Sequence, residues 1–470
     1  MVIGSGLMGF NGFYEQAKKC SNNLNGFNGK VQVVSHIDAD GLTSAGIISK
    51  TLKREGITHD VDFVKSLDKE KIEDLADQNP EFIIFTDLGS NLTNKLKELN
   101  SKIIISDHHE PLNEKENNIL HLNPHLFGIN GANELSGAGT TFFLSKALNK
   151  NNTDLADLAI TGSIGDLQDS KGRLEGINRK IIKIGEKNNI IECKKDLRLF
   201  GKQTRPVYKL LEHANDPYIP GITGNKKETI KFLNELDISL KNGERWRRWI
   251  NLTQEEKKKI ISKLIHYCLS NNVPNEETER LVGEVYILLK EEPGTELRDA
   301  SEFSTLLNAT ARYGHSQTGL KLCLGDRNEA YKKAKKLLKQ HRRNLMNGLD
   351  LVRNKGVNKL SDLQYFDLKN EVRDTIVGII AGMSVNLDSI DRDLPVIAFA
   401  EKDEDNIKVS SRATQKLIFK GLDLGKALQK ASSEVNGEGG GHDIAAGATI
   451  PKGKKEEFIN KLNKIINHQL

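Results

Sequence analysis

The sequence predicts an α/β protein whose parallel sheet carries acidic and histidine side chains at one edge. Two observations predict this fold class. Short apolar segments alternate with segments of helical periodicity in the first third of the chain, which is the pattern of βαβ units. A second set of such segments follows a long charged helical segment near the carboxyl end, so a smaller second α/β domain is expected there.

The first domain is expected to hold four buried strands with helices between them. The strands are expected at 31–35, 60–64, 82–86 and 102–106. Helices are expected near 42–54, 68–77, 91–99, 155–167 and 177–187. Connections this short and regular favour a doubly wound sheet with helices on both faces.

The rest of the chain divides into a helical insertion, a long helix and the second domain. Thr253 opens a capping box, so a helix is expected to start there. A charged helix without proline is expected over about 327–354. In the second domain, strands are expected at 363–368, 395–400 and 407–411, with helices near 373–383, 423–433 and 454–467.

Composition limits the class of protein. A chain of 470 residues with 37% apolar and 28% charged residues is typical of a soluble protein with two or three domains. No apolar run reaches the roughly 18 residues of a membrane span, and the amino terminus lacks the pattern of a secretory signal. Four widely spaced cysteines argue against a disulfide framework or a zinc ribbon. We therefore expect a cytoplasmic protein with no membrane partner.

Positive charge gathers in two segments, although the net charge is only +5. One predicted helix contains Lys332, Lys333, Lys335, Lys336, Lys339, Arg342 and Arg343. The other segment, residues 245–249, interleaves three arginines with two tryptophans, as single-strand binding channels do. The same spacing also fits the start of an amphipathic helix with Trp246 and Trp249 on one buried face. Both segments are equally compatible with a polyanion site and with a solvated or structural surface.

The strand ends carry the residues of most interest. His36, Asp38 and Asp40 have the i, i+2, i+4 spacing that places side chains on one face of a strand. Asp87 follows the next apolar strand, and Asp107-His108-His109 follows the one after it. Asp166 comes after small residues that allow close backbone approach. Because ligands gather at the carboxyl ends of parallel strands, these side chains are expected to meet.

This set of side chains indicates a metal site. A lone aspartate at a strand end is usually a helix cap, and a lone histidine is usually structural. Three strands ending in such residues at one sheet edge make the joint structural interpretation the weaker one. Carboxylates with imidazoles suit a pair of Mn²⁺ or Mg²⁺ ions better than structural zinc, which prefers thiolates. Two such ions clamp the oxygens of a phosphoryl displacement.

One motif is set aside. Residues 4–9 match the G-x-G-x-x-G dinucleotide pattern, but the three residues before them are too few for an anchored strand. We expect a flexible amino-terminal turn there and no cofactor loop.

The metal-site residues resemble the signature of the DHH phosphoesterase superfamily. Near the carboxyl end, residues 439–448 (Gly-Gly-Gly-His-Asp-Ile-Ala-Ala-Gly-Ala) resemble the glycine-rich signature of the DHH-associated domain. The layout is similar to RecJ-type single-strand exonucleases, and residues 204–221 resemble the archaeal branch called GINS-associated nuclease. The resemblance implies a DHH catalytic domain at 25–200, an insertion at 201–325, a linking basic helix at 326–355 and a DHH-associated substrate-binding domain at 356–470.

The resemblance also implies roles for single residues. His36 and Asp38 would bind one metal ion, and Asp40, His108 and Asp166 the other, with Asp87 bridging them. Asp107 would orient its neighbours, and His109 would face the scissile phosphate. In the second domain the residues implied to contact substrate are Ser411, Arg412, Gly440, Gly441 and His442. Exposed backbone N–H groups in the glycine run could cradle a phosphate, although a mobile loop is the plainer interpretation.

The resulting hypothesis is a Mn²⁺- or Mg²⁺-dependent exonuclease. Its substrate would be single-stranded DNA, degraded 5′→3′ to mononucleotides by resemblance, in replication or repair. One alternative is an exonuclease acting on RNA or short oligonucleotides, since no residue pattern reports selection of the 2′-OH. Another is a replisome scaffold that binds a GINS-type partner and has weak activity. A chain that carries both domains and the linking helix can form its cleft as a monomer.

Overall fold

The computed structural model describes residues 3–112, 118–214, 216–385, 387 and 389–470, with side chains described from residue 9 onward. The chain divides into two compact units, Met1–Leu338 and Lys339–Leu470. Each unit is described by itself. Among the described residues, no helix is both long enough and apolar enough to cross a lipid bilayer.

The first unit is built on a five-stranded parallel sheet. Its strands are β1 (Lys30–His36), β2 (Thr58–Val64), β3 (Phe82–Thr86), β4 (Lys102–Ser106) and β5 (Ile119–Leu122). The order β2-β1-β3-β4-β5, with every pair parallel, is that of a doubly wound sheet with its switch point between β1 and β3. The predicted α/β fold class is therefore confirmed.

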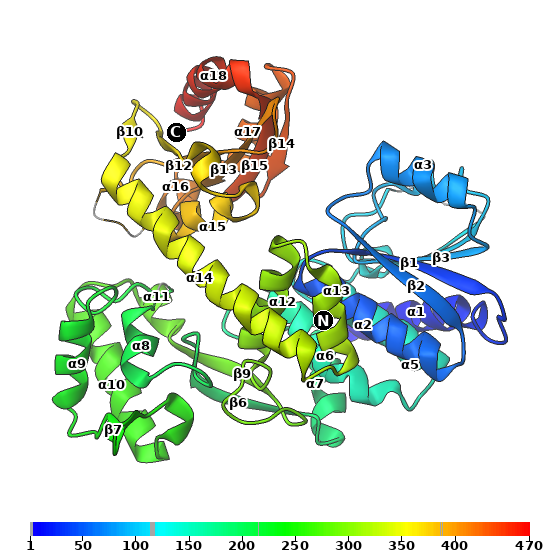
Figure 1. The fold of residues 1–470 in the computed structure, drawn as a ribbon, viewed down its shortest axis with the longest axis horizontal. Helices are drawn as coiled ribbons and strands as arrows, with labels where there is room; N and C mark the ends of the chain where they lie inside the picture. The colour runs from blue at the N-terminus through cyan, green and yellow to red at the C-terminus, as the bar shows by residue number, and fades with distance from the viewer. Residues whose placement is uncertain (1–2, 113–117, 215, 386, 388) are drawn as a thin grey trace. The chain divides into compact units, whose positions relative to one another are not determined.

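Helices cover both faces of this sheet because its strands are apolar on both sides. Alternate residues along β3 enter different cores: Phe82 and Ile84 face one, and Ile83 and Phe85 face the other. Figure 1 shows α3 on one side of β1–β3 and α1, α2 and α5 on the other. The helices are α1 (Ile3–Asn22), α2 (Ala39–Arg54), α3 (Lys69–Gln78), α4 (Thr93–Leu96), α5 (Gly137–Leu148), α6 (Ala156–Gly165) and α7 (Asn178–Lys187).

Three local predictions for this unit differ from the structure. Residues 4–9 lie within α1, so the predicted flexible turn is wrong; Phe13, farther along this helix, is fully buried in the core beside α5. The strand β5 was not predicted, because four residues that include His121 give a weak periodic signal. The helix α5 was not predicted either, since it begins Gly-Ala-Gly-Thr-Thr, residues of mostly low helix propensity. Its start is fixed by Ser136, whose hydroxyl caps the Gly139 N–H.

The insertion lies between the two strands of an antiparallel ribbon. The ribbon pairs β6 (Ile191–Leu197) with β9 (Val282–Leu288), and the chain between them has its own apolar core, in which Trp249 is buried. Its helices are α8 (Val207–Glu212), α9 (Lys226–Asn234), α10 (Gln254–Ser270) and α11 (Asn275–Glu279), with a hairpin of β7 (Lys241–Asn242) and β8 (Arg245–Trp246). Thr253 caps α10 through the predicted capping box. The insertion is mainly helical, as predicted.

Three helices follow the ribbon. They are α12 (Ala300–Arg312), α13 (Ser316–Leu324) and the predicted long helix α14 (Glu329–Lys355). The first of them packs against α2 and α6, so it lies beside the edge of the sheet where the strands end.

The second unit contains a mixed six-stranded sheet. Its order is β10-β11-β12-β13-β15-β14, and only β11 and β12 pair in parallel. The strands are β10 (Asn358–Lys359), β11 (Gln364–Asp367), β12 (Val396–Glu401), β13 (Asn406–Arg412), β14 (Glu438–Gly441) and β15 (Ala445–Pro451). The helices are α15 (Asp374–Ser384), α16 (Gln415–Phe419), α17 (Leu424–Ser433) and α18 (Lys455–Asn467).

The glycine-rich signature is part of this sheet. Gly439, Gly440 and Gly441 form the edge strand β14, paired in antiparallel register with Ala448, Gly447 and Ala446 of β15. The mobile-loop interpretation is therefore wrong for this run, and only residues 442–444 form the turn of the hairpin. At the sheet edge, the outward N–H groups of β14 have no neighbouring strand among the described residues.

Candidate metal centre

The predicted ligands converge because the strands that carry them end at the same level. Ser35, Thr86 and Ser106 are register partners across β1, β3 and β4. The next residues in each chain segment are therefore His36, Asp87 and Asp107, side by side at one sheet edge. Asp87 has φ = 60°, a left-handed conformation that aspartate tolerates and that turns the chain sharply out of β3.

Three groups of ligand-type side chains form at this edge among the described residues, and two of them contain the predicted metal ligands. One contains His36, whose Nδ1 lies 3.1 Å from an Asp38 oxygen and 3.5 Å from Asp87 Oδ2. The other contains His108, whose Nε2 lies 3.7 Å from an Asp40 oxygen and whose Nδ1 lies 3.8 Å from an Asp166 oxygen. Within each group the ligand-type atoms all lie within 4.8 Å of one another.

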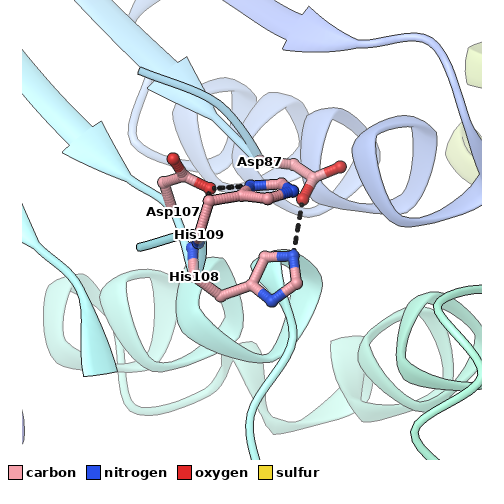
Figure 2. A group of neighbouring side chains, drawn as sticks. All are labelled: Asp87, Asp107, His108 and His109. Carbon is pink, nitrogen blue, oxygen red and sulfur yellow. Dashed lines mark hydrogen bonds and ion pairs between the residues drawn. The ribbon is translucent and has the colours of Figure 1, made fainter. Parts of the chain in front are cut away.

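Asp87 lies beside both His36 and His108. Its Oδ2 lies 3.5 Å from His36 Nδ1, and its Oδ1 lies 3.2 Å from His108 Nε2. Figure 2 shows the contact between Asp87 and His108. The side chain is only 2% exposed. One buried carboxylate thus presents an oxygen to each group, which is the geometry of a bridging ligand.

Backbone amides fix the second carboxylate. Asp40, 1% exposed, accepts hydrogen bonds from Gly137 N at 2.7 Å and Ala138 N at 3.0 Å, the first N–H groups of α5. A Cβ at Gly137 would lie 2.5 Å from Asp87 Oδ1, and one at Gly162 would lie 2.4 Å from Asp40 Oδ1. These two glycines therefore leave the space that the carboxylates fill.

Asp107 accepts hydrogen bonds from its own segment and from the segment after β3. Its Oδ2 accepts from Ser90 N at 2.9 Å, and its Oδ1 accepts from His108 N at 2.7 Å and from His109 Nδ1 at 2.8 Å. Although burial opposes ionisation, these donors and the two histidines hold the pKa of Asp107 well below its usual range. Asp107 therefore stays ionised and orients His109, whose ring is 55% exposed (Figure 2).

A hydrogen bond at Nδ1 also fixes the orientation of the His108 ring. Its Nδ1 donates to the Gly131 carbonyl at 2.8 Å, so its Nε2 faces Asp87 and Asp40. Gln168 Nε2 donates to the same carbonyl at 2.8 Å and to an Asp166 oxygen at 3.0 Å. Such partners set the tautomer and orientation of a metal-binding histidine.

A bound cation would stabilise the carboxylates at this sheet edge. Burial and the neighbouring Asp87 carboxylate raise the pKa of Asp40, and the same causes raise the pKa of Asp166 to about 6. Against the cost of burial, Asp38 and Asp87 raise the pKa of His36 to about 11. The carboxylates thus repel one another, and the histidines take up protons beside them. A divalent ion would relieve both effects.

The donor set fits such an ion. Asp87 Oδ1 and His36 Nδ1 are buried without an aligned hydrogen bond among the described residues. The three candidate groups contain carboxylate and imidazole donors and no thiolate. These are the donors preferred by Mn²⁺ and Mg²⁺.

In the second unit the predicted substrate residues do not all share a face. Arg412 lies at the end of β13 against Gly378 and Gly382 of α15, with its Nη1 donating to the Ser411 carbonyl at 2.7 Å. Because side chains alternate along a strand, Ser410 lies on the same side as Arg412, against Gly378. Ser411 is fully buried, and its hydroxyl donates to Ala446 O at 3.0 Å. The prediction that Ser411 contacts substrate is therefore wrong.

The other predicted substrate residues line one open pocket of about 590 Å³. Gly440, Gly441 and His442 share it with Lys426 of α17. The turn that holds His442 follows β14 at the end of the sheet where Arg412 pairs with Ala445. The structure thus brings Arg412 and the glycine run to the same end of this sheet.

The segment 245–249 is mostly held within the protein, as in the structural interpretation. The predicted helix start is wrong, since Arg245–Trp246 form β8 and Trp249–Asn251 form a short 3-10 helix. Trp249 is buried and its indole N–H donates to Asp196 at 2.9 Å. Arg247 makes a bidentate ion pair with Glu256, and Arg248 donates to two backbone carbonyls. Only Arg245 is exposed, so most of the segment is unavailable to stack bases.

Some residues beside the site were not foreseen. The Gly131 carbonyl and Gln168 act through His108 and Asp166, and Asn308 and Arg312 approach from α12. Burial lowers the pKa of the Arg312 guanidinium, while the charge of Asp38 opposes that change. These residues lie far from the ligands in sequence or act through backbone atoms, so no local motif marks them.

Domain models and relatives agree with this picture. A model of the DHH family N-terminal domain matches residues 30–163, a DHH-CID domain model matches 199–282, and a DHHA1 domain model matches 361–468. An uncharacterized protein of Methanocaldococcus jannaschii is 32% identical over 448 residues, which cover 94% of each chain. The single-stranded-DNA-specific exonuclease RecJ of Bacillus subtilis is 30% identical over 151 residues, which are 29% of this chain and 19% of that protein.

Solved structures share the fold. RecJ in complex with Mn²⁺ from Thermus thermophilus superposes with a TM-score of 0.60 at 17% identity, covering 97% of this chain and 55% of that chain. CDC45 from Entamoeba histolytica gives a TM-score of 0.65 at 14% identity, covering 97% and 98%. Because one relative is 32% identical over nearly the whole length and three domain models match in order, the chain belongs to the DHH phosphoesterase superfamily.

Proposed function

We propose that this protein is a divalent-metal-dependent exonuclease that hydrolyses phosphodiester bonds of single-stranded DNA. The observation that carries the proposal is the position of Asp87, which offers one oxygen to the His36–Asp38 group and the other to the group of Asp40 and His108. A shared carboxylate between two donor groups is what a pair of metal ions requires.

The chain would hold two ions, Mn²⁺ or Mg²⁺. His36 and Asp38 would hold one; Asp40, His108 and Asp166 the other; and Asp87 would bridge them. When bound, the ions would supply Lewis acidity toward the phosphate oxygens. The RecJ structure from Thermus thermophilus, which is similar in fold, contains Mn²⁺.

His109 would act on the phosphate itself. Its Nδ1 is held by Asp107, which leaves Nε2 as the ring atom that can donate to a substrate oxygen. The hydrogen bond to Asp107 raises the pKa of His109 despite burial, which favours a protonated ring. A cationic donor placed where negative charge develops stabilises the transition state of phosphoryl transfer.

The choice of single-stranded DNA rests on one relative, and the 5′→3′ direction and mononucleotide products rest on the family resemblance of the sequence. The curated relative from Bacillus subtilis is named a single-stranded-DNA-specific exonuclease. A GINS-type partner and a place in replication or repair remain predictions.

The function is tested by digesting end-labelled DNA and RNA strands with Mn²⁺ and with EDTA. We expect Mn²⁺-dependent release of mononucleotides from DNA, faster from a strand with a free 5′ end than from one blocked there. Release from RNA alone would support the RNA-directed alternative. Release from neither polymer, by protein that binds Mn²⁺, would overturn the nuclease and favour a binding role.

The second unit would hold substrate phosphates. We expect Arg412→Ala to weaken binding of a single strand about tenfold, because a guanidinium–phosphate pair is a strong charged hydrogen bond. Fluorescence anisotropy of a labelled strand, with EDTA present, measures this binding. Lys416→Ala removes an equal charge from the exposed α16, which makes it the matched control. Unchanged affinity in Arg412→Ala would contradict the role, and Arg412→Lys separates charge from guanidinium geometry.

A further inference from the structure

The peptide between two predicted ligands has a partner from a remote helix. Ala39 lies between Asp38 and Asp40 and is the first residue of α2. The N–H groups of a first helical turn have no acceptor within their helix. Ala39 N donates instead to Asn308 Oδ1 on α12, at 3.0 Å and across 269 residues of sequence. The Asp38 carboxylate has other partners: its Oδ1 accepts from Gly41 N at 3.0 Å, and its Oδ2 lies 3.1 Å from His36 Nδ1.

The helix that carries Asn308 is firmly held. Phe303, Leu306 and Leu307 are buried in the main core of the first unit, so the middle of α12 is fixed by packing. Its first turn is fixed by Glu302, which is fully buried and accepts from Gln203 N at 2.8 Å and from the Thr204 hydroxyl. Asn308 therefore projects from a rigid element, the kind of support that a preorganised site needs.

The position of the Ala39 peptide matters because its two neighbours belong to different ligand groups. Asp38 lies with His36, whereas Asp40 lies with His108 and Asp166. Rotation of the peptide plane at Ala39 would change the separation of these two carboxylates. Asp40 is also tied to α5 through Gly137 N, so movement at Ala39 would be taken up mainly on the side of Asp38.

We propose that Asn308 is a positioning residue of the metal centre. Its side-chain carbonyl fixes the Ala39 peptide and thereby the spacing of Asp38 and Asp40. This inference rests on the proposed function, since it assumes that these carboxylates bind metal ions. Asn308 contacts neither ion nor substrate in this role; it acts through the backbone. No residue near it in sequence belongs to the predicted ligand set.

The test compares substitutions that remove or keep the acceptor. Asn308→Leu has nearly the same shape and no acceptor, whereas Asn308→Asp keeps an oxygen at the same place. The control is Thr305→Val on the same helix, because the Thr305 hydroxyl donates only to the Ser301 carbonyl of its own helix. Mn²⁺ affinity is measured by calorimetry, and the electron paramagnetic resonance spectrum of bound Mn²⁺ reports the ligand geometry. Thermal unfolding in EDTA shows that each variant is folded.

The expected result follows from the cost of losing a partner behind a metal ligand. Asn308→Leu should bind Mn²⁺ at least about tenfold more weakly, with an altered spectrum, while Asn308→Asp and Thr305→Val stay within about threefold of the parent protein. Affinity and spectrum unchanged in Asn308→Leu would overturn the inference. So would equal losses in folded Asn308→Leu and Asn308→Asp, since the acceptor would then be irrelevant. If the parent protein itself binds no Mn²⁺, the proposed function fails instead.

Discussion

Replacing Asp87 with asparagine is expected to lower Mn²⁺-dependent hydrolysis about a thousandfold or more without unfolding the protein. The amide keeps the volume of the side chain but removes the charge that faces both ligand groups. Only a carboxylate can serve both His36 and His108 from opposite oxygens. Binding should fall to at most one ion, measured by titration with Mn²⁺.

The same change should leave the metal-free protein folded and change its stability only a little, because the Asp87 charge has two opposing effects. Burial and the Asp87 charge raise the pKa of Asp40, which means that these two carboxylates oppose each other in the folded state. Removing one charge relieves that repulsion, but it also removes the attraction of Asp87 for the protonated rings of His36 and His108, so the two effects offset each other. Thermal unfolding in EDTA measures the effect. Asp62→Asn is the matched control. Asp62 lies on the edge strand β2, which holds none of the predicted ligands, and its carboxylate pairs with Lys71. Near-normal activity of Asp87→Asn would refute the bridging role.

Mn²⁺ is expected to stabilise the protein by about 2.7 kcal/mol for each bound ion at a hundred times the dissociation constant of that ion. The gain should be larger at about pH 8 than at about pH 6, because ligands must lose protons to bind an ion. Differential scanning calorimetry with Mn²⁺ and with EDTA at both values measures this difference.

The pH dependence follows from the direction of two shifts. Asp166 has its pKa raised from 3.8 to about 6 by burial and by Asp87, so its contribution to stability is present below 3.8 and is lost as pH rises through about 6. Despite burial, Asp38 and Asp87 raise the pKa of His36 from 6.5 to about 11. The stability that His36 contributes through this shift is present below pH 6.5 and is lost as the pH rises toward 11. The metal-free protein therefore loses stability from His36 in the range where metal binding improves. A gain from Mn²⁺ that is equal or smaller at the higher pH would contradict this account.

Much of the fold and the metal centre could be predicted because the informative residues are local. Each of three apolar strands is followed at once by an aspartate or a histidine, and parallel strands bring such ends together. The roles of these residues as ligands remain predictions, although the structure gathers them into compact groups. The glycine-rich run was recognised as a signature, but its pairing as the strand β14 was not, because glycines carry no periodic apolar signal.

What could not be predicted depends on contacts between distant segments. Nothing near Asn308 in the sequence indicates that its side chain reaches Ala39. The need for glycine at 137 and 162 is set by the carboxylates of Asp87 and Asp40, which arrive from other strands. Ser411 is a different case. Strand alternation alone places Ser410 beside Arg412, so the error could have been avoided.

The strands β1, β3 and β4 end at the same level in the sheet, and this alignment has a consequence for folding. Ser35, Thr86 and Ser106 are register partners, and a slip of one residue would displace a strand end by roughly 3.3 Å and exchange its two faces. Apolar side chains cover both faces of these strands, so burial alone distinguishes the shifted alignment only weakly. A shifted strand would carry Asp87 or His108 away from its neighbours and could not complete the cluster. Metal ions would thus bind preferentially to the correctly aligned sheet. A higher concentration of the cation would therefore increase the fraction of molecules that fold with the correct strand alignment.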